Sequence, residues 1–188
     1  MTEVADVTFI IPHLIGRDSL GVMLESIRTQ TILPKAVLVC SVTDPRLQGW
    51  GNGARAWNTM LPAVRTEWIA TANDDDRLLP NHVEACVPFF GTADVIYTWD
   101  QERRLPCIDC AQWPTVGGLY RRLCEGNFIT YAFLRRSRVL EVGGWDPMVP
   151  QATSFPDWDL FLRLAKTGAR FKCVPVGTYV YSGSHHDN

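Results

Sequence analysis

Apolar residues gather in short runs along the chain, and stretches with helical spacing separate these runs. Residues 7–12 and 36–42 are nearly continuous apolar runs, a pattern typical of strands buried on both faces of a parallel sheet. The segment between them has apolar residues at helical spacing, namely Leu20, Met23, Leu24 and Ile27. The first 42 residues therefore predict a βαβ unit with a right-handed crossover.

The same alternation continues to residue 98. It predicts a helix at 54–64, a strand at 68–72, a helix at 81–87 and a strand at 94–98. Residues 99–126 are rich in turn residues, cysteine and aromatics, and predict no element. Further on, the predicted strands are 129–134, 170–174 and 178–181, and the predicted helices are 137–142 and 157–166. We expect a single α/β domain with a mostly parallel sheet flanked by helices.

The chain has 188 residues, of which 46% are hydrophobic and 20% charged, as is ordinary for a globular domain. The formal charge of −2 shows no excess of basic residues over acidic ones, which argues against nucleic acid as a partner. Residues 1–6 lack the pattern of a secretory signal, and no apolar run is long enough to span a bilayer. We therefore expect a cytoplasmic protein.

The six cysteines are expected to be unpaired thiols, because a domain of this size does not need disulfides. Three of them fall in apolar segments, where a free cysteine behaves as a small hydrophobic residue: Cys40, Cys86 and Cys173. Cys107 and Cys110 form one CxxC pair, and Cys124 follows. A structural zinc site is the less favoured alternative, because it needs a second pair.

Three consecutive carboxylates, Asp74, Asp75 and Asp76, follow the predicted strand at 68–72, and Asn73 precedes them. In an open α/β sheet, ligands bind at the carboxyl ends of the strands. Adjacent carboxylates repel one another unless a cation neutralises them, and oxygen ligands suit Mg²⁺ or Mn²⁺, which also bind phosphate oxygens. The sequence therefore predicts a metal and phosphate site, with a solvated acidic turn as the alternative.

Gly51, Gly53 and Ala56 match the letters of the dinucleotide-binding fingerprint. That fingerprint must close its strand tightly, whereas about nine residues separate these glycines from the preceding strand. We interpret residues 43–53 as a loop whose glycines let the backbone approach a ligand.

Asp157 opens the last predicted helix. The helix dipole keeps a carboxylate in the first turn ionised and ready to accept a proton, which predicts a general base. Ser154 offers the alternative of a capping box, in which Asp157 is purely structural. Asp159 is predicted to pair with Arg163 at i+4. His185 belongs either to a disordered tail or to a metal or diphosphate site.

Taken in order, these segments resemble the GT-A fold glycosyltransferases of family 2, inverting enzymes that use nucleotide sugars. Residues 7–12 are similar to the opening strand of that family, and the resemblance covers nearly the whole chain. The other matching segments, with the family's patterns, are 26–31 (S-x-x-x-Q-T), 53–58 (G-x-x-x-A-x-N), 73–80 (D-A-D-D-x-x-x-P), 142–146 (V-G-G-F-D) and 156–164 (E-D-W-D-L-x-x-R-L).

The resemblance implies roles for individual positions. Asp75 would be the main ligand of Mn²⁺ or Mg²⁺, with Asp76 and His185 beside it and Asp74 near the ribose and diphosphate. Asp157 would deprotonate the acceptor. The nucleotide site would contain Pro12, Ser41, Asp44, Arg55, Asn58, Asn73, Asp74 and Asp75. The sugar and acceptor side would contain Gly144, Trp145, Asp146 and Trp158. The chain departs from the family at Asn73 and Ser41, where an acidic residue is usual.

The resemblance thus implies a metal-dependent inverting glycosyltransferase that moves a sugar from a nucleotide-diphosphate sugar, with UDP as the expected nucleotide, to an acceptor hydroxyl. Residues 1–98 would bind the nucleotide sugar, and residues 99–188 the acceptor. The alternatives are a non-catalytic sugar-nucleotide or carbohydrate-binding module, and a nucleotidyltransferase, which is disfavoured because residues 13–18 lack lysine. The acceptor stays open among saccharide, lipid, protein and modified nucleic acid, and a protein partner or a second copy is expected to help bind it.

Overall fold

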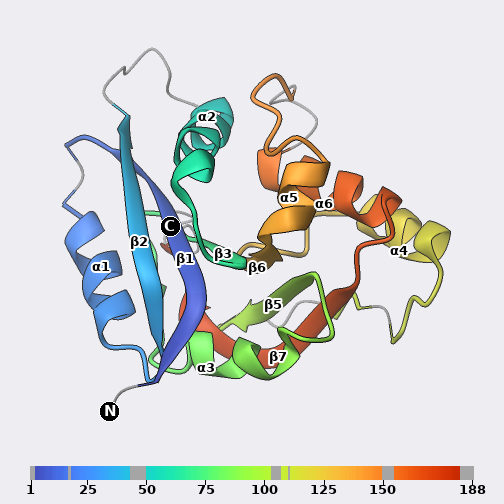
Figure 1. The fold of residues 1–188 in the computed structure, drawn as a ribbon, viewed down its shortest axis with the longest axis horizontal. Helices are drawn as coiled ribbons and strands as arrows, with labels where there is room; N and C mark the ends of the chain where they lie inside the picture. Colours follow the sequence, from blue (N-terminus) through green and yellow to red (C-terminus); the bar gives the residue numbers. More distant parts are fainter. Residues whose placement is uncertain are drawn as a thin grey trace.

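The computed structural model describes residues 3–16, 18–42, 50–102, 107–109, 111–149 and 155–182. Within these residues, seven strands form one sheet in the order β2-β1-β3-β6-β5-β7-β4 (Figure 1). The strands are β1 (Val4–Leu14), β2 (Leu33–Val42), β3 (Trp68–Thr71), β4 (Arg77–Leu78), β5 (Val95–Asp100), β6 (Ala132–Arg135) and β7 (Phe171–Val180). In this part of the chain β1, β2, β3, β5 and β7 point the same way, whereas β6 and β4 run antiparallel to their neighbours. The predicted α/β fold with a mostly parallel sheet is confirmed.

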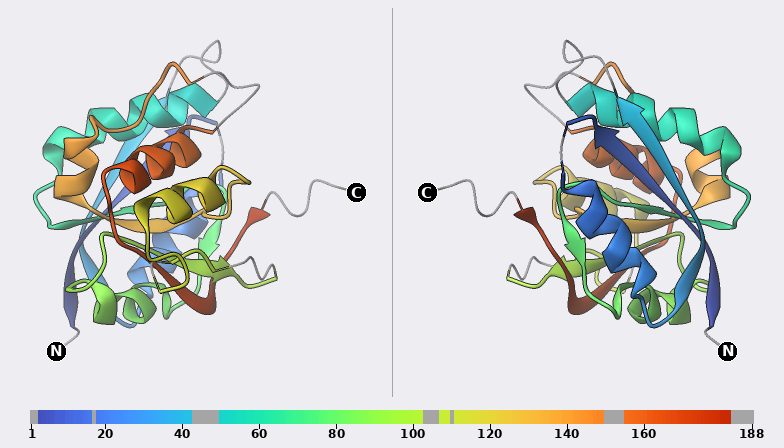
Figure 2. Two further views of the ribbon diagram at one scale, coloured as in Figure 1. Left: turned by 90° about the vertical axis from the view of Figure 1, so that its right-hand side faces the viewer. Right: turned by 90° about the vertical axis from the view of Figure 1, so that its left-hand side faces the viewer.

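Helices cover both faces of the sheet (Figures 1 and 2). On one face lie α1 (Leu20–Arg28) and α3 (His82–Cys86). On the other lie α2 (Trp50–Met60), α4 (Val116–Leu123), α5 (Arg136–Glu141) and α6 (Pro156–Lys166). Each face has its own cluster of buried apolar side chains. Within the described residues, no helix has the length and apolar character needed to cross a membrane.

Strand β1 lies at the centre of the first half of the sheet. Its residue Ile10 is in parallel register with Leu38 of β2 and Thr71 of β3. Phe9, Ile10 and Ile11 are fully buried, because the helices on the two faces cover successive side chains of the strand. The continuous apolar run read from the sequence is therefore a strand buried on both faces, and β1, α1 and β2 form the predicted βαβ unit.

Some boundaries differ from the prediction. Gly51 and Gly53 lie in α2 and not in a loop, while residues 43–49 of the predicted loop lie outside the described residues. α2 ends at Met60 and a 3-10 turn follows, because Pro62 has no N–H to continue an α-helix. α4 forms where no element was predicted, and its N-cap Thr115 accepts a hydrogen bond from the N–H of Gly118 at 3.1 Å. β7 is one strand where two were predicted.

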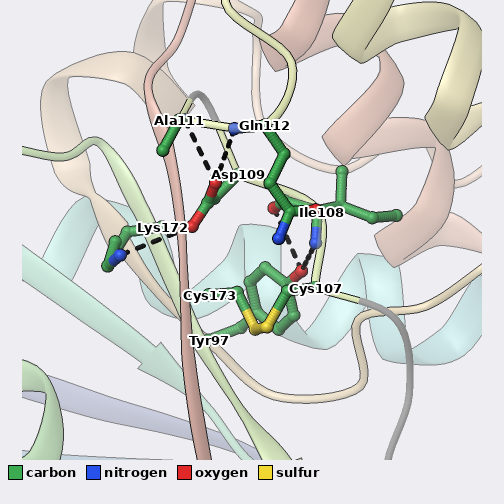
Figure 3. Close-up of a disulfide and its surroundings, with 8 residues drawn as sticks. All are labelled: Tyr97, Cys107, Ile108, Asp109, Ala111, Gln112, Lys172 and Cys173. Atoms are coloured by element: carbon green, nitrogen blue, oxygen red, sulfur yellow. Dashed lines mark hydrogen bonds and ion pairs between the residues drawn. A yellow bond between two sulfur atoms is a disulfide. The ribbon is translucent and has the colours of Figure 1, made fainter.

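The structure overturns the expectation that all cysteines are unpaired. Cys107 and Cys173 form a disulfide with their Cα atoms 5.3 Å apart (Figure 3). The backbone of Ile108 also accepts a hydrogen bond from the hydroxyl of Tyr97 and donates one to it. These contacts fasten the segment before α4 to β5 and β7. No local signal predicts the bond, because only the fold brings positions 66 apart in sequence together.

The remaining cysteines that the structure describes are free thiols, namely Cys40, Cys86 and Cys124. Cys110, the second member of the CxxC pair, lies outside the described residues. Disulfides are rare in the reducing cytosol. The disulfide between Cys107 and Cys173 therefore gives the expected cytoplasmic location no support, and that location stays a prediction.

Candidate active site

A cavity of about 460 Å³ lies at the carboxyl-terminal edge of the sheet. The parallel strands deliver residues to it from their ends: Pro12 from β1, Thr71 from β3, Asp100 from β5 and Tyr179 from β7. The first turn of α6 adds Asp157. This is the place where open α/β sheets bind their ligands.

Asp157, the predicted base, thus lies in the cavity. Its Oδ1 accepts a hydrogen bond from the N–H of Trp158 at 2.7 Å. Burial outweighs the hydrogen bonds that this carboxylate accepts and raises its pKa to about 6, whereas the helix dipole alone would lower it. At pH 7 about nine-tenths of the molecules would still have Asp157 ionised, so it combines a usable charge with raised basicity. Ser154, its predicted capping partner, lies outside the described residues.

Asp74 of the predicted metal motif is buried against the end of β1. Its Oδ2 accepts hydrogen bonds from Nδ1 of His13 at 2.8 Å and from the N–H of Leu14 at 3.0 Å. This carboxylate therefore fixes the end of β1 to the loop after β3. Asp75, the next residue, is partly exposed.

Asp76 is also buried, and both of its oxygens accept hydrogen bonds. Oδ1 accepts from the N–H of Ser182 at 2.6 Å, and Oδ2 accepts from the hydroxyl of Tyr131 and from the side-chain amide of Asn73 at 3.3 Å. Burial is the main cause that raises the pKa of Asp76. Asp76 therefore joins β7 and the start of β6 to the acidic loop, and Asn73 extends from this network into the lining of the cavity.

The predicted cation has to fit this arrangement. Within the described residues, no three His, Cys, Asp or Glu side chains converge on one point. Mg²⁺ is usually held by one or two carboxylates together with substrate phosphate oxygens and not by a cage of protein ligands. The residues present fit that mode, with Asp75 as the carboxylate. Asp75 is not among the described residues that line the cavity, although its neighbour Asn73 is. His185 lies outside the described residues.

Sequence reasoning missed several polar residues of the cavity, among them Asp100, Asn127 and Tyr131. Asp100 ends β5, and its carboxylate accepts hydrogen bonds from the N–H groups of Glu102 at 2.7 Å and Tyr181 at 2.9 Å. A signal existed for Asp100, because it follows the predicted strand at 94–98 just as the triplet follows the predicted strand at 68–72. Asn127 and Tyr131 instead precede a strand, and they reach this edge of the sheet because β6 is antiparallel.

Asn58, which was predicted for the nucleotide site, holds the segment after α5. Its Nδ2 donates to the carbonyl oxygen of Trp145 at 2.6 Å, and its Oδ1 accepts from the N–H of Trp145 at 3.0 Å. Arg163 donates to the carbonyl oxygen of Gly144 at 2.8 Å and pairs with Asp159 at 2.7 Å, which confirms the predicted ion pair. Trp145 itself is buried. In this structure the Gly-Gly-Trp segment is part of the scaffold that supports α2 and α6.

We expect Gly144→Ala to lower the free energy of unfolding by about 3 kcal/mol. Its φ is +77°, and a Cβ there would lie 2.5 Å from Oδ1 of Asn58, so both hydrogen bonds to Trp145 would be disturbed. Gly143→Ala is the matched control, because its φ is +80° with nothing within 4 Å, and it should cost about 1 kcal/mol. Urea unfolding measures both, and equal losses would show that the contact with Asn58 contributes nothing.

The remaining predicted residues lie elsewhere. Arg55 on α2, Ser41 near the end of β2, and Asp146 are exposed. Nε1 of Trp158 donates to the carbonyl oxygen of Leu123 at 2.7 Å and joins α6 to α4. None of these four is among the described residues that line the cavity. Asp44 lies outside the described residues.

No protein-family model matches the chain. The uncharacterized glycosyltransferase YwdF of Bacillus subtilis (strain 168) is 24% identical to this chain over an alignment of 187 residues. The alignment covers 86% of this chain and 68% of YwdF.

Solved structures share the fold at low sequence identity. S. aureus TarS has a TM-score of 0.67 at 14% identity, covering 93% of this chain and 36% of TarS. The mannosyltransferase PcManGT from Pyrobaculum calidifontis has a TM-score of 0.65 at 15% identity, covering 94% and 56%. The catalytic domain of Drosophila β1,4-galactosyltransferase 7 has a TM-score of 0.62 at 12% identity, covering 99% and 74%. The chain thus spans 36% to 56% of the first two neighbours.

These comparisons confirm the GT-A fold and the resemblance to glycosyltransferases that the sequence predicted. The relative and two of the neighbours are named as sugar transferases. TarS has been solved in complex with UDP and with UDP-GlcNAc, and PcManGT in complex with GDP-Man and Mn²⁺. The fold and the name of the relative together indicate a transferase.

Proposed function

We propose that this protein is an inverting, metal-dependent glycosyltransferase of the family 2 type, which transfers a sugar from a nucleotide-diphosphate sugar to an acceptor hydroxyl. The observation that carries the proposal is that Asp157 and Asn73, the residue before the aspartate triplet, line one cavity at the carboxyl ends of the strands. In this proposal residues 1–98 bind the donor and residues 99–188 bind the acceptor.

In the proposed reaction, the acceptor oxygen forms a bond to the anomeric carbon while Asp157 takes the proton of the hydroxyl. The bond between that carbon and the diphosphate oxygen breaks, and its electron pair leaves with the nucleoside diphosphate. Attack from the face opposite the leaving group inverts the anomeric configuration. The cavity would hold both substrates in line, which removes much of the entropic barrier.

Asp75 is the proposed carboxylate ligand of Mn²⁺ or Mg²⁺. A bound cation would stabilise the negative charge on the leaving diphosphate. Asp74 and Asp76 would act on this site indirectly, because the hydrogen bonds that they accept hold the loop on both sides of Asp75. Two fixed neighbours and one partly exposed carboxylate support the assignment of Asp75 as the ligand.

We propose a UDP-sugar as the donor, in line with the complexes of TarS with UDP and UDP-GlcNAc. The acceptor contributes a hydroxyl group. We also propose that a partner or a second copy of this chain helps to bind the acceptor.

A thermal-shift panel of UDP and GDP, each with and without Mn²⁺, tests donor and metal together. We expect UDP to raise the melting temperature more than GDP does, and most strongly with Mn²⁺; a larger shift with GDP would contradict the proposed nucleotide. Asp75→Asn should weaken that nucleotide's Mn²⁺-dependent binding at least about tenfold, since it removes a charged ligand. Asp6→Asn is the control, because Asp6 is exposed near the amino-terminal end of β1 and pairs with Lys35 at 3.0 Å.

Two outcomes would contradict the proposal. If neither nucleotide shifts the melting temperature under any condition, the chain lacks the donor site. If Asp6→Asn weakens binding as much as Asp75→Asn, the effect is a general loss of stability, and Asp75 is not the ligand.

A further inference from the structure

The segment from Gly126 to Tyr131 leads from α4 into antiparallel β6, and its polar side chains enter the cavity. We propose that Asn127, on this segment, is a positioning residue that donates a hydrogen bond to the carboxylate of Asp157 and holds it as a base. The inference rests on the proposed function, which assigns the base role to Asp157.

The contact is specific in its direction. Asn127 and Asp157 both line the cavity, and their side chains are hydrogen-bonded to each other. Oδ1 of Asn127 accepts from the N–H of Ile129 at 3.4 Å, which leaves its NH₂ group to face the carboxylate. An ionised carboxylate only accepts hydrogen bonds, so this orientation of the amide suits the charged form of Asp157.

The backbone around Asn127 is held on both sides. The ring of Phe128 lies 4.5 Å from the guanidinium carbon of Arg122 on α4, and Ile129 is buried in the core. The hydroxyl of Tyr131 donates to Asp76. Asn127 therefore comes from a fixed segment, which is the requirement for a residue that orients another side chain.

The chemistry follows from two opposing effects on Asp157. Burial favours its neutral form, whereas the hydrogen bonds from Asn127 and from the N–H of Trp158 favour the ionised form. Of the charged side chains nearby, Asp159 on α6 is paired with Arg163. Asp100 is the other carboxylate among the described residues of the cavity. Removing Asn127 would thus leave a carboxylate that is less ionised at neutral pH and held by one hydrogen bond fewer, with that from the N–H of Trp158 remaining.

The same segment also reaches the acidic loop. Tyr131 donates to Asp76 through its hydroxyl and accepts from the N–H of Asn73 at 3.2 Å. One short stretch of chain thus contacts the proposed base through Asn127 and the metal-motif loop through Tyr131. This arrangement sets the position of the base relative to the donor side of the cavity.

Carbon-13 NMR of aspartate carboxyl groups tests the inference without any substrate. The wild-type protein should show one aspartate with a pKa of about 6, identified by its absence in Asp157→Asn. We expect Asn127→Ala to move this titration to higher pH. Asn127→Asp, which keeps the shape but adds a negative charge, should move it further, as expected for coupled carboxylates. Asn81→Ala, at the start of α3, is the matched control and should leave it in place.

Turnover gives the second readout. If Asn127 acts through Asp157, Asn127→Ala should lower kcat about 10- to 100-fold with donor affinity unchanged, and it should have no further effect in the Asp157→Asn background. An unchanged titration of Asp157 in both Asn127 variants would overturn the inference, and so would a loss of stability with no shift in that titration. Full turnover of Asp157→Asn would instead remove the proposed base while leaving the hydrogen bond to be seen by NMR, so the two failures are distinguishable.

Discussion

Replacing Asp157 with asparagine is expected to lower turnover of the nucleotide sugar by about 10²- to 10⁴-fold, because an amide cannot accept the proton of the attacking hydroxyl. Asparagine has nearly the same shape as aspartate, so donor binding should persist. Release of UDP or GDP from UDP-GlcNAc or GDP-mannose measures turnover. The thermal shift caused by the free nucleotide measures binding.

The matched control is Asp159→Asn, two residues along the same helix. Asp159 pairs with Arg163, and it is not among the described residues of the cavity. This variant should lose some stability but keep its turnover per folded molecule. Normal turnover of Asp157→Asn would exclude Asp157 as the base.

The pKa of Asp157 predicts opposite pH trends for rate and stability. The rate should fall as the pH drops below about 6, because the protonated carboxyl cannot act as a base. Stability should fall as the pH rises from 3.8 to about 6, because the folded protein binds this proton more tightly than the unfolded chain does. Above pH 6 the desolvated charge costs about 2–3 kcal/mol, so Asp157→Asn should be more stable than the wild type at pH 7.5.

A residue whose removal stabilises the fold but abolishes the reaction is retained for its chemistry. The structural alternative predicts the reverse, because a capping aspartate contributes to stability and its loss would lower it. Urea unfolding of the wild type and of Asp157→Asn at pH 7.5 therefore separates the two roles that the sequence left open for this position.

Elements with a strong pattern were predictable from the sequence. The apolar run of β1 and the helical stripe of α1 identified the βαβ unit, because each pattern extends over the whole element. Likewise, Trp68–Thr71 was identified as a strand with polar residues at its carboxyl end. For the site, the structure brings Asn73 and Asp157 into one cavity, whereas Asp75 is not among the described residues that line it, and the roles of these residues stay predictions.

Other features depend on tertiary structure that no local pattern encodes. α4 contains Gly117 and Gly118, which weaken a helical prediction, and its stability comes from packing against α6. Asn127 and Tyr131 reach the cavity only because β6 runs antiparallel between β3 and β5. A rule that searches the carboxyl ends of parallel strands does not find residues that precede an antiparallel strand.

The match to a sequence motif also did not determine the role of Asn58. Its position in the G-x-x-x-A-x-N segment implied a contact with the nucleotide, whereas the structure shows two hydrogen bonds to the backbone of Trp145. Asn58 and the Gly-Gly-Trp segment are 87 residues apart, so the sequence presents them as two separate motifs. In the fold they form one contact that positions α2 beside the cavity. This packing contact accounts for the presence of Asn58 and of the Gly-Gly-Trp segment in the same chain.

Breaking the Cys107–Cys173 disulfide is expected to lower the free energy of unfolding by about 4 kcal/mol. The bond closes a loop of 66 residues, and its main effect is to restrict the unfolded chain. The folded loop should stay in place, because Asp109 contacts Nζ of Lys172 at 3.4 Å and Ile108 is bonded to Tyr97 (Figure 3). Urea unfolding with and without a thiol reductant measures the difference.

The control for this experiment is the double variant Cys107→Ser, Cys173→Ser, which should be as unstable as the reduced wild type and indifferent to reductant. Cys124→Ser removes an exposed free thiol and should respond to reductant as the wild type does. If reductant destabilises the double variant equally, the loss does not come from this bond. Turnover should change little on reduction, because the hydrogen bonds to Asp157 and Asp76 from Asn127, Trp158, Tyr131 and Ser182 do not involve either bonded cysteine.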